Sequence, residues 1–255
     1  MWERIHLPVA TRCNVKCRFC DQSRGSACHS SRPGYAERTM GADEAAEVVR
    51  REITRRPCLR IVAVSGPGDP LANNETFDLL EALKDLKPWV EFCLSTNGVL
   101  LRDRADILRD LGVTALSVSI STVTPSTASR IYEWADLDGR RVRGIDMGTE
   151  IVRRQIEGIV SARRAGIHVK ANTILIPSLN GTEISHLAHE LHSCGAEIQN
   201  IVPLIPSGDF RDMKMISDRD IGEARGTAST WMRQFVHCAQ CRSDVVGIPG
   251  CDCLL

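Results

Sequence analysis

The sequence lacks several features that would tie it to nucleic acid or to membranes. Its 32 lysine and arginine residues balance 32 aspartate and glutamate residues, so the chain has no net charge. There is thus no bulk electrostatic attraction to nucleic acid or to an anionic membrane, and we expect neither as a partner. No apolar run approaches the roughly 20 residues of a membrane-spanning helix. The N-terminus shows no basic region followed by an apolar core, so we expect a cytoplasmic protein without a secretory signal.

Repeats, low-complexity tracts and clear linkers are also missing, which favours one compact unit. A chain of 255 residues with 43% hydrophobic residues can bury a sizeable core. What the chain does have is cysteine, with 11 residues. Without a secretory signal, this number indicates metal ligation in a reducing compartment rather than a disulfide framework.

Three of these cysteines form the most informative motif. Cys13, Cys17 and Cys20 follow a Cys-x3-Cys-x2-Cys spacing, directly after the apolar run 5–10. Three thiolates on one short loop can hold three irons of a [4Fe–4S] cluster and leave the fourth iron open to a small molecule. A zinc site is the alternative, but zinc sites usually pair two Cys-x2-Cys knuckles. The aromatic Phe19 before the last cysteine resembles the cluster loop of radical S-adenosylmethionine (SAM) enzymes, where such a residue lies next to the adenine of SAM.

Apolar, β-branched runs alternate with amphipathic stretches along the chain. The predicted strands are 4–10, 59–65, 90–96, 115–121, 167–176 and 198–205, and the predicted helices are 41–56, 74–87, 103–111, 125–133, 147–165, 181–194 and 217–235. Six strand–helix units predict a parallel α/β sheet, open as a partial (β/α)6 TIM-type barrel rather than closed with eight strands. We expect the core domain to span 1–236, with 21–40 as a loop over the cluster and 237–255 as an irregular, cysteine-bearing C-terminal tail packed on the same domain.

Polar motifs end the predicted strands, where ligands gather in such sheets. After the second strand come Gly66, Pro67, Gly68 and Asp69, and after the third come Ser95, Thr96 and Asn97. The glycines let a ligand approach the backbone closely, and in radical SAM enzymes such a turn binds the amino group of SAM. The other interpretation is an ordinary turn at each place, since Gly-Pro and Asn-Gly both favour turns without any ligand.

The fourth and fifth strands add further candidates for binding SAM. Ser119 lies on the fourth strand, and Lys170 and Asn172 share one face of the fifth. An inward lysine is costly unless it meets an anion, so the carboxylate of SAM is a plausible partner for Lys170.

The tail carries a second metal motif, the Cys-x2-Cys knuckle of Cys238 and Cys241. Such a knuckle is half a metal site and needs ligands from elsewhere. Cys28 is the natural third ligand, and Cys93 at a strand end is another candidate. Buried thiols without a metal are the alternative for all four. Metal binding and disorder are equally open for Cys251 and Cys253 at the end of the chain.

Taken together, these motifs resemble the NifB family of radical SAM enzymes from about Ile5 to Gly247. The resemblance rests on the three cysteines of the loop and on the segments 5–10, 31–34, 66–73, 93–98, 131–139, 154–158, 200–205 and 237–244. This combination is far more specific than a generic radical SAM signature. His6 stands at a position that the family shares, and its role there is either structural or beside a cluster.

The resemblance implies a three-cluster enzyme. A [4Fe–4S] cluster on Cys13, Cys17 and Cys20 would cleave SAM, and one or two additional [4Fe–4S] clusters would be substrates. Family members move a methyl group from SAM to a substrate cluster and convert its carbon to the carbide of an [8Fe–9S–C] nitrogenase cofactor precursor. Motif matching implies that Cys28, Cys238 and Cys241 hold one substrate cluster and that Cys93 helps to hold the other. The implied partners are a reductant such as ferredoxin or flavodoxin, a donor of iron–sulfur clusters, and a carrier or scaffold for the cofactor.

Two departures from the family pattern keep other functions open. The usual His-Pro-Cys motif upstream of the first strand is not found in this sequence, which starts at Met1. An Asn-Glu pair is replaced by Cys28-His29-Ser30, without the carboxylate that could accept a proton. The alternatives are a NifB-derived radical SAM enzyme with a single auxiliary cluster and another substrate, or a non-catalytic iron–sulfur scaffold. The polar strand ends that would bind SAM argue against the scaffold.

Overall fold

The computed structural model describes residues 2–20, 36–238 and 242–255. Six parallel strands lie side by side in the order β1-β3-β4-β5-β8-β9. They are β1 (Glu3–His6), β3 (Leu59–Val64), β4 (Glu91–Thr96), β5 (Val113–Ser119), β8 (His168–Leu175) and β9 (Ile198–Pro203). Within the described ranges, β9 forms an outer edge of this sheet and does not pair with β1. The predicted open, six-stranded α/β architecture is therefore confirmed.

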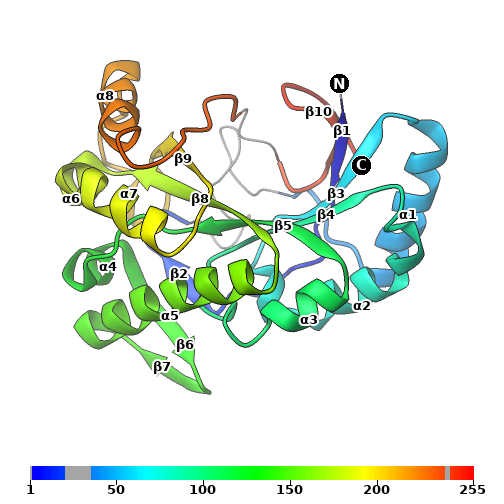
Figure 1. The fold of residues 1–255 in the computed structure, drawn as a ribbon, viewed down its shortest axis with the longest axis horizontal. Coiled ribbons are helices and arrows are strands. Elements are labelled where there is room, and N and C mark those ends of the chain that lie inside the picture. Colours follow the sequence, from blue (N-terminus) through cyan, green and yellow to red (C-terminus); the bar gives the residue numbers. More distant parts are fainter. Residues whose placement is uncertain (1, 21–35, 239–241) are drawn as a thin grey trace.

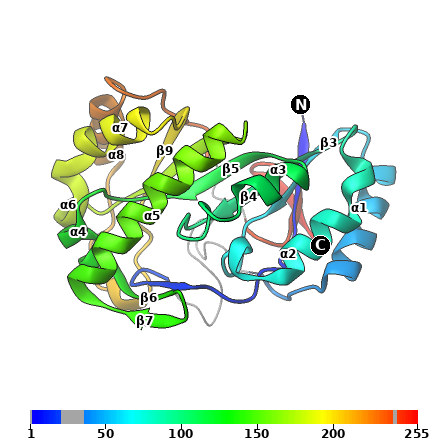
Figure 2. The same ribbon diagram turned by 60° about the horizontal axis from the view of Figure 1, so that its bottom comes forward.

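Helices follow the strands and cover the sheet, as Figures 1 and 2 show. They are α1 (Ala42–Arg55), α2 (Asn74–Ala82), α3 (Ala105–Asp110), α4 (Pro125–Ile131), α5 (Gly144–Arg164), α6 (Pro177–Asn180), α7 (Ile184–Ser193) and α8 (Asp218–Ala228), with short 3-10 turns η1 (Pro70–Ala72), η2 (Lys84–Leu86), η3 (Gly181–Glu183) and η4 (Gly208–Phe210). In Figure 1, α5, α3, α2 and α1 follow one another along one side of the curved sheet. None of the helices in the described part of the chain is long and apolar enough to cross a membrane.

The helix ends follow local sequence chemistry. Helix α1 has acidic residues in its first turn and Arg55 in its last, which suits the helix dipole. Helix α8 begins with a capping box between Ser217 and Asp220. The predicted helix 217–235 extends seven residues too far at its C-terminal end, because the helix ends at Ala228 and the chain continues as turns.

A second, three-stranded sheet escaped the sequence prediction. It pairs β2 (Val15–Cys17) with β6 (Tyr132–Leu137), and β6 with β7 (Arg140–Val142). The predicted helix 125–133 stops at Ile131, where Tyr132 opens β6. Asp138 and Gly139 turn the β6–β7 hairpin with φ values of 50° and 78°. Asp-Gly is a strong hairpin signal, so this sheet could have been found from the sequence.

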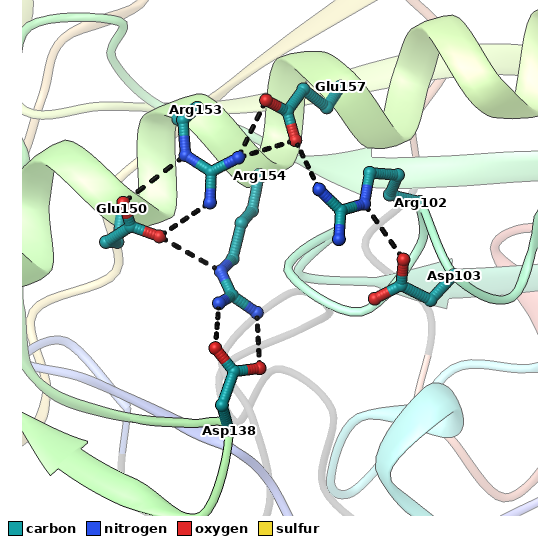
Figure 3. A network of polar contacts seen from close by, with 7 residues as sticks. All are labelled: Arg102, Asp103, Asp138, Glu150, Arg153, Arg154 and Glu157. Atoms are coloured by element: carbon teal, nitrogen blue, oxygen red, sulfur yellow. Dashed lines mark hydrogen bonds and ion pairs between the residues drawn. The ribbon is translucent and has the colours of Figure 1, made fainter.

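Charged side chains fasten this hairpin to α5 (Figure 3). The guanidinium group of Arg154 binds both carboxylate oxygens of Asp138 in the hairpin turn. Only 11% of the Arg154 side chain is exposed, which favours a specific contact over a loose surface ion pair. Arg153 and Arg102 both bind Glu157, at 2.7 Å and 3.1 Å, and so join the loop before α3 to the same network.

The prediction of an irregular tail is wrong for its last part. Strands β10 (Val245–Ile248) and β11 (Cys251–Leu254) form an antiparallel hairpin, and β10 pairs with β1 at the edge of the main sheet. Val245 and Val246 are buried there, and Gly250 turns the hairpin with a φ of 89°. Cys251 and Cys253 are exposed on β11. They are ordered strand residues and do not line either of the cavities considered next.

Candidate active site

The three cysteines of the loop lie around one cavity at the carboxyl end of the parallel sheet. Cys13, Cys17 and Cys20 all line it. Cys17 belongs to β2 and pairs with Tyr132 of β6, and the backbone N–H of Cys20 donates to the carbonyl of Cys17 at 3.0 Å. The small sheet that the sequence prediction missed therefore fixes the second half of the cysteine loop.

The first half of the loop is held by the glycine-rich turn after β3. A Cβ atom on Gly68 would come within 2.1 Å of the carbonyl oxygen of Arg12, so no larger residue fits there. The side-chain oxygen of Asn73 accepts hydrogen bonds from the N–H groups of Thr11 and Arg12, at 3.2 Å and 3.1 Å. Pro67 and Gly68 also line the cavity, whereas Gly66 does not. At Gly68 the backbone of the turn therefore lies directly against the backbone of Arg12.

Asp69 joins this turn to the end of β4. Its buried carboxylate accepts hydrogen bonds from the Thr96 hydroxyl at 2.9 Å and from the N–H of Asn97 at 2.6 Å. Burial raises the pKa of Asp69, and these hydrogen bonds act in the opposite direction. Thr96 and Asp69 therefore serve as a rigid support that positions Asn97.

Asn97 contacts the first cysteine of the loop. Its amide nitrogen donates to the side-chain oxygen of Asn14 at 2.8 Å and lies 3.8 Å from the Sγ atom of Cys13. Burial raises the pKa of Cys13 to about 12, and the charge of Asp69 adds to the effect. A thiolate at this place is costly by itself, but an iron ligand is deprotonated by its metal. The donor set therefore fits an iron–sulfur cluster bound by all three cysteines.

Across residues 2–20, 36–238 and 242–255, no group of three or more His, Cys, Asp or Glu side chains is close enough to hold one ion. In a [4Fe–4S] cluster each cysteine binds a different iron, so the three thiolates need not converge on one point.

The opposite wall of this cavity consists of strands β5, β8 and β9. Ser119, Asn172 and Asn200 pair across these strands in one row, and all three line the cavity. The side-chain nitrogen of Asn200 donates to the Asn172 oxygen at 3.0 Å. The Asn200 oxygen is buried without a hydrogen-bond partner in the described structure, which marks it as an acceptor for a ligand. The predicted site residues did not include Asn200, although it opens the segment 200–205 on which the family resemblance partly rests.

The lining of this cavity mixes apolar and polar groups, as sites for small organic molecules commonly do. Phe19 lines it and packs on Phe210, with ring centroids 6.5 Å apart. Ser95 and Thr96 also line it. Of the predicted SAM-binding residues, only Gly66 and Lys170 lie outside this lining.

A second cavity adjoins the first inside the barrel. Its lining includes Arg4, His6, Cys93, Lys170, His237 and Cys238, together with the small residues Ala63, Ser95 and Ser117. Ser65, Ser95, Asn172 and Cys238 line both cavities. Burial raises the pKa of Cys93, and the nearby charge of Lys170 acts against this rise. The structure thus brings Cys93 and Cys238 to one cavity, whereas Cys28 and Cys241 lie outside the described residues.

His6 is held in one orientation in this second cavity. Its Nδ1 atom lies 2.9 Å from the carbonyl oxygen of Arg242, and a carbonyl can only accept, so Nδ1 carries the proton. Burial, together with the charge of Arg4, lowers the pKa of His6 to about 4. The imidazole is therefore neutral near pH 7, with the lone pair on Nε2, which is the form that binds metals.

Comparison with known proteins identifies the family of the chain. The radical SAM superfamily profile matches residues 7–191. The chain is 37% identical over 256 residues to the FeMo cofactor biosynthesis protein NifB of Klebsiella pneumoniae, covering 98% of this chain and 54% of that protein. It is 33% identical to NifB of Methanocaldococcus infernus, covering 96% of this chain and 81% of that protein. The chain thus spans about half of the bacterial relative and four-fifths of the archaeal one.

Solved structures agree on the fold. Streptococcus suis SuiB bound to S-adenosylmethionine superimposes with a TM-score of 0.65 at 14% identity, over 93% of this chain and 51% of that one. A radical SAM methyltransferase from Sphaerobacter thermophilus gives a TM-score of 0.60 at 20% identity, over 92% of this chain and 65% of that one. The motifs, the fold and the sequence relatives lead to one conclusion: this chain belongs to the radical SAM superfamily and, within it, to the NifB family of FeMo cofactor biosynthesis proteins.

Proposed function

We propose that this protein is a radical SAM enzyme that builds the iron–sulfur precursor of a nitrogenase cofactor. In this reaction two [4Fe–4S] substrate clusters, a carbon from SAM and one additional sulfide from a sulfur donor give an [8Fe–9S–C] product. The observation that carries the proposal is the pair of adjoining cavities. One is lined by the three cysteines of the loop and the other by Cys93, and Cys238 lies in the wall that both share, so a SAM site and a substrate site would adjoin each other.

The first cavity holds the cofactor and SAM in this proposal. Cys13, Cys17 and Cys20 would hold the resident [4Fe–4S] cluster, which supplies the electron for reductive cleavage of SAM. Asn97 fixes the Cys13 side chain through its contact with Sγ. Ser119, Asn172 and Asn200 offer hydroxyl and amide groups for the hydroxyl groups of SAM, and Phe19 offers an apolar ring for its adenine.

The second cavity receives the substrate. Cys93 and Cys238 are the thiol ligands that the described residues supply there, and the neutral imidazole of His6 is a third candidate ligand. Ser65, Ser95, Asn172 and Cys238 line both cavities, so SAM in the first cavity and the substrate in the second would be close neighbours. A ferredoxin or flavodoxin, a cluster donor and a cofactor carrier complete the reaction as proposed partners.

Anaerobic iron and sulfide analysis with EPR spectroscopy, before and after addition of SAM, tests this function. About twelve irons per chain, with one cluster signal that shifts on SAM addition, is the expected result for one resident and two substrate clusters. About eight irons with the same shift would instead indicate the enzyme with a single auxiliary cluster and a different substrate. Iron without any response to SAM would contradict both and indicate a scaffold.

A further inference from the structure

Lys170 lies on β8, and its partly exposed side chain lines the second cavity. Its neighbours across the sheet are Ser117 on β5 and Ile198 on β9. Ala171 faces the opposite, apolar side of the strand and is fully buried, so the strand alternation directs Lys170 inward. An ammonium group that faces a cavity can offer its charge and its three N–H donors to an anionic ligand there.

The lining of the two cavities shows where that ligand would be. Lys170 lines the second cavity, whereas it is not among the residues that line the first, where SAM would bind. Asn172, two residues further along β8, lines both and stands between them. The carboxylate of SAM is for this reason a poor partner for Lys170, in contrast to the expectation from the sequence.

The charges of the second cavity are unbalanced. Its other cation, Arg4, is neutralised by the carboxylate of Asp252 and also donates to the carbonyl of Gly247. No ion pair within the described structure includes Lys170, and none of the described residues that line this cavity is an aspartate or glutamate. The Nζ atom of Lys170 instead lies over the ring of Phe235, 5.2 Å from its centroid. This cation–π contact holds the ammonium group in the cavity and leaves its charge for a ligand.

We propose that Lys170 is a positioning residue that holds the anionic iron–sulfur substrate in the second cavity. Cys93 and Cys238 line the same cavity, and a cluster bound by thiolates carries net negative charge over its sulfides. The ammonium group supplies three N–H donors to these sulfides and a positive charge at close range. The inference rests on the proposed function, because it requires a substrate cluster in this cavity.

A cation beside a cluster has a measurable electrostatic consequence. It stabilises the reduced cluster, which bears one more negative charge, more than the oxidised cluster. Lys170 would consequently raise the reduction potential of the substrate cluster and increase its retention. The resident cluster in the first cavity would be affected less, because Lys170 does not line that cavity.

The test compares K170M, K170R and the control K214M in the full chain after anaerobic reconstitution. Lys214 is exposed, so K214M removes one charge from the surface alone. We expect K170M to lower the reduction potential of the substrate cluster and to release it faster in a chelator challenge, with K170R close to the wild type. The dissociation constant for SAM should stay within about twofold in all three variants.

Two results would overturn the inference. One is an unchanged potential and retention of the substrate cluster in K170M. The other is a loss of SAM affinity of about tenfold in K170M that K170R restores, which would assign Lys170 to the carboxylate of SAM. A wild-type chain with only about four irons would contradict the proposed function itself. This iron content is measured before any variant is made, so the two failures can be told apart.

Discussion

The two cavities of this molecule are built in different ways. The first is surrounded by fixed hydrogen bonds, in which Asn73 holds the backbone of the cysteine loop and Asp69 holds Thr96 and Asn97. The second is lined by groups that bind metals or anions, such as Cys93, Cys238 and Lys170. The difference indicates that the first site is shaped before SAM arrives, whereas the second depends on its ligand for compensation of charge and burial.

Loss of a ligand of the resident cluster is expected to have the largest effect on this arrangement. C17A should abolish reductive cleavage of SAM, because the cluster would lose one of its three thiolates. The measurement is formation of 5′-deoxyadenosine by the reconstituted protein with a chemical reductant. C58A serves as the control, since Cys58 is an exposed thiol outside both cavities. Undiminished deoxyadenosine in C17A would refute the assignment of the first cavity.

The arrangement should respond in the opposite way to the loss of Cys238, which lies in the wall that the two cavities share. C238A should lower the iron content by about four per chain, because one substrate cluster loses a ligand. Cleavage of SAM that is uncoupled from the substrate should persist. C253A, which removes an exposed thiol of β11, should leave the iron content unchanged. Equal iron content in C238A and the wild type would mean that the tail knuckle has a structural role alone.

The rigidity of the first cavity can be tested at Gly68. A methyl group there meets the carbonyl of Arg12 at 2.1 Å, and both partners are backbone. G68A should therefore destabilise the metal-free protein by about 2–4 kcal/mol and displace the cysteine loop. Denaturant titration measures the first effect. The control G226A changes an exposed helix position with open space around its Cβ, and it should be neutral or slightly stabilising. Equal stability of G68A and the wild type would show that the loop moves freely.

The second cavity should make the metal-free protein sensitive to acid. His6 has its pKa lowered from 6.5 to about 4, mainly by burial. Between these values the unfolded chain binds a proton that the folded chain does not, so stability falls as the pH falls through this window. The loss from His6 is at most about 3 kcal/mol. The thermal midpoint of H6N should decline less between pH 7 and pH 4 than that of the wild type. Parallel declines in the two proteins would contradict the burial of a neutral imidazole.

The smallest expected effect concerns Asn200 in the wall of the first cavity. Its buried oxygen lacks a partner in the described structure, and a donor group of SAM would satisfy it. N200L should weaken SAM binding by about 1–2 kcal/mol, because an apolar side chain cannot accept that hydrogen bond. Equilibrium dialysis measures the affinity. The control is S229A, which changes an exposed residue. N180L would not serve, because Asn180 is buried and hydrogen-bonded. Unchanged affinity in N200L would remove Asn200 from the SAM site.

Sequence reasoning located most of the fold and of the first cavity because its signals are local. The cysteine spacing, the alternation along β8 and the polar strand ends each lie within a few residues, and Cys13, Asn97 and Asn172 are found where they were expected. The register between strands is not local, so the partner strand of Cys17 and the role of Asn200 were missed.

The second cavity shows the same limit more clearly. The alternation of β8 correctly predicts that Lys170 points inward. It does not predict which of the two cavities the side chain lines. Ser117 and Lys170 are neighbours only because β5 and β8 pair in one particular register. The tail was predicted as irregular, and its short apolar segment 245–248 gains strand structure through pairing with β1 and β11.

The small residues that face the second cavity also affect the stability of the whole protein. Closed eight-stranded barrels fill their interior with layers of valine, isoleucine and leucine, whereas Ala63, Ser95 and Ser117 leave this interior hollow. Each methylene group that is missing from a core forgoes about 0.8 kcal/mol of hydrophobic stabilisation. The stability of the barrel must therefore come from the outer layer, where helices pack on buried residues such as Leu94 and Leu116. In this architecture the capacity to bind a large ligand and the stability of the empty protein are in direct competition.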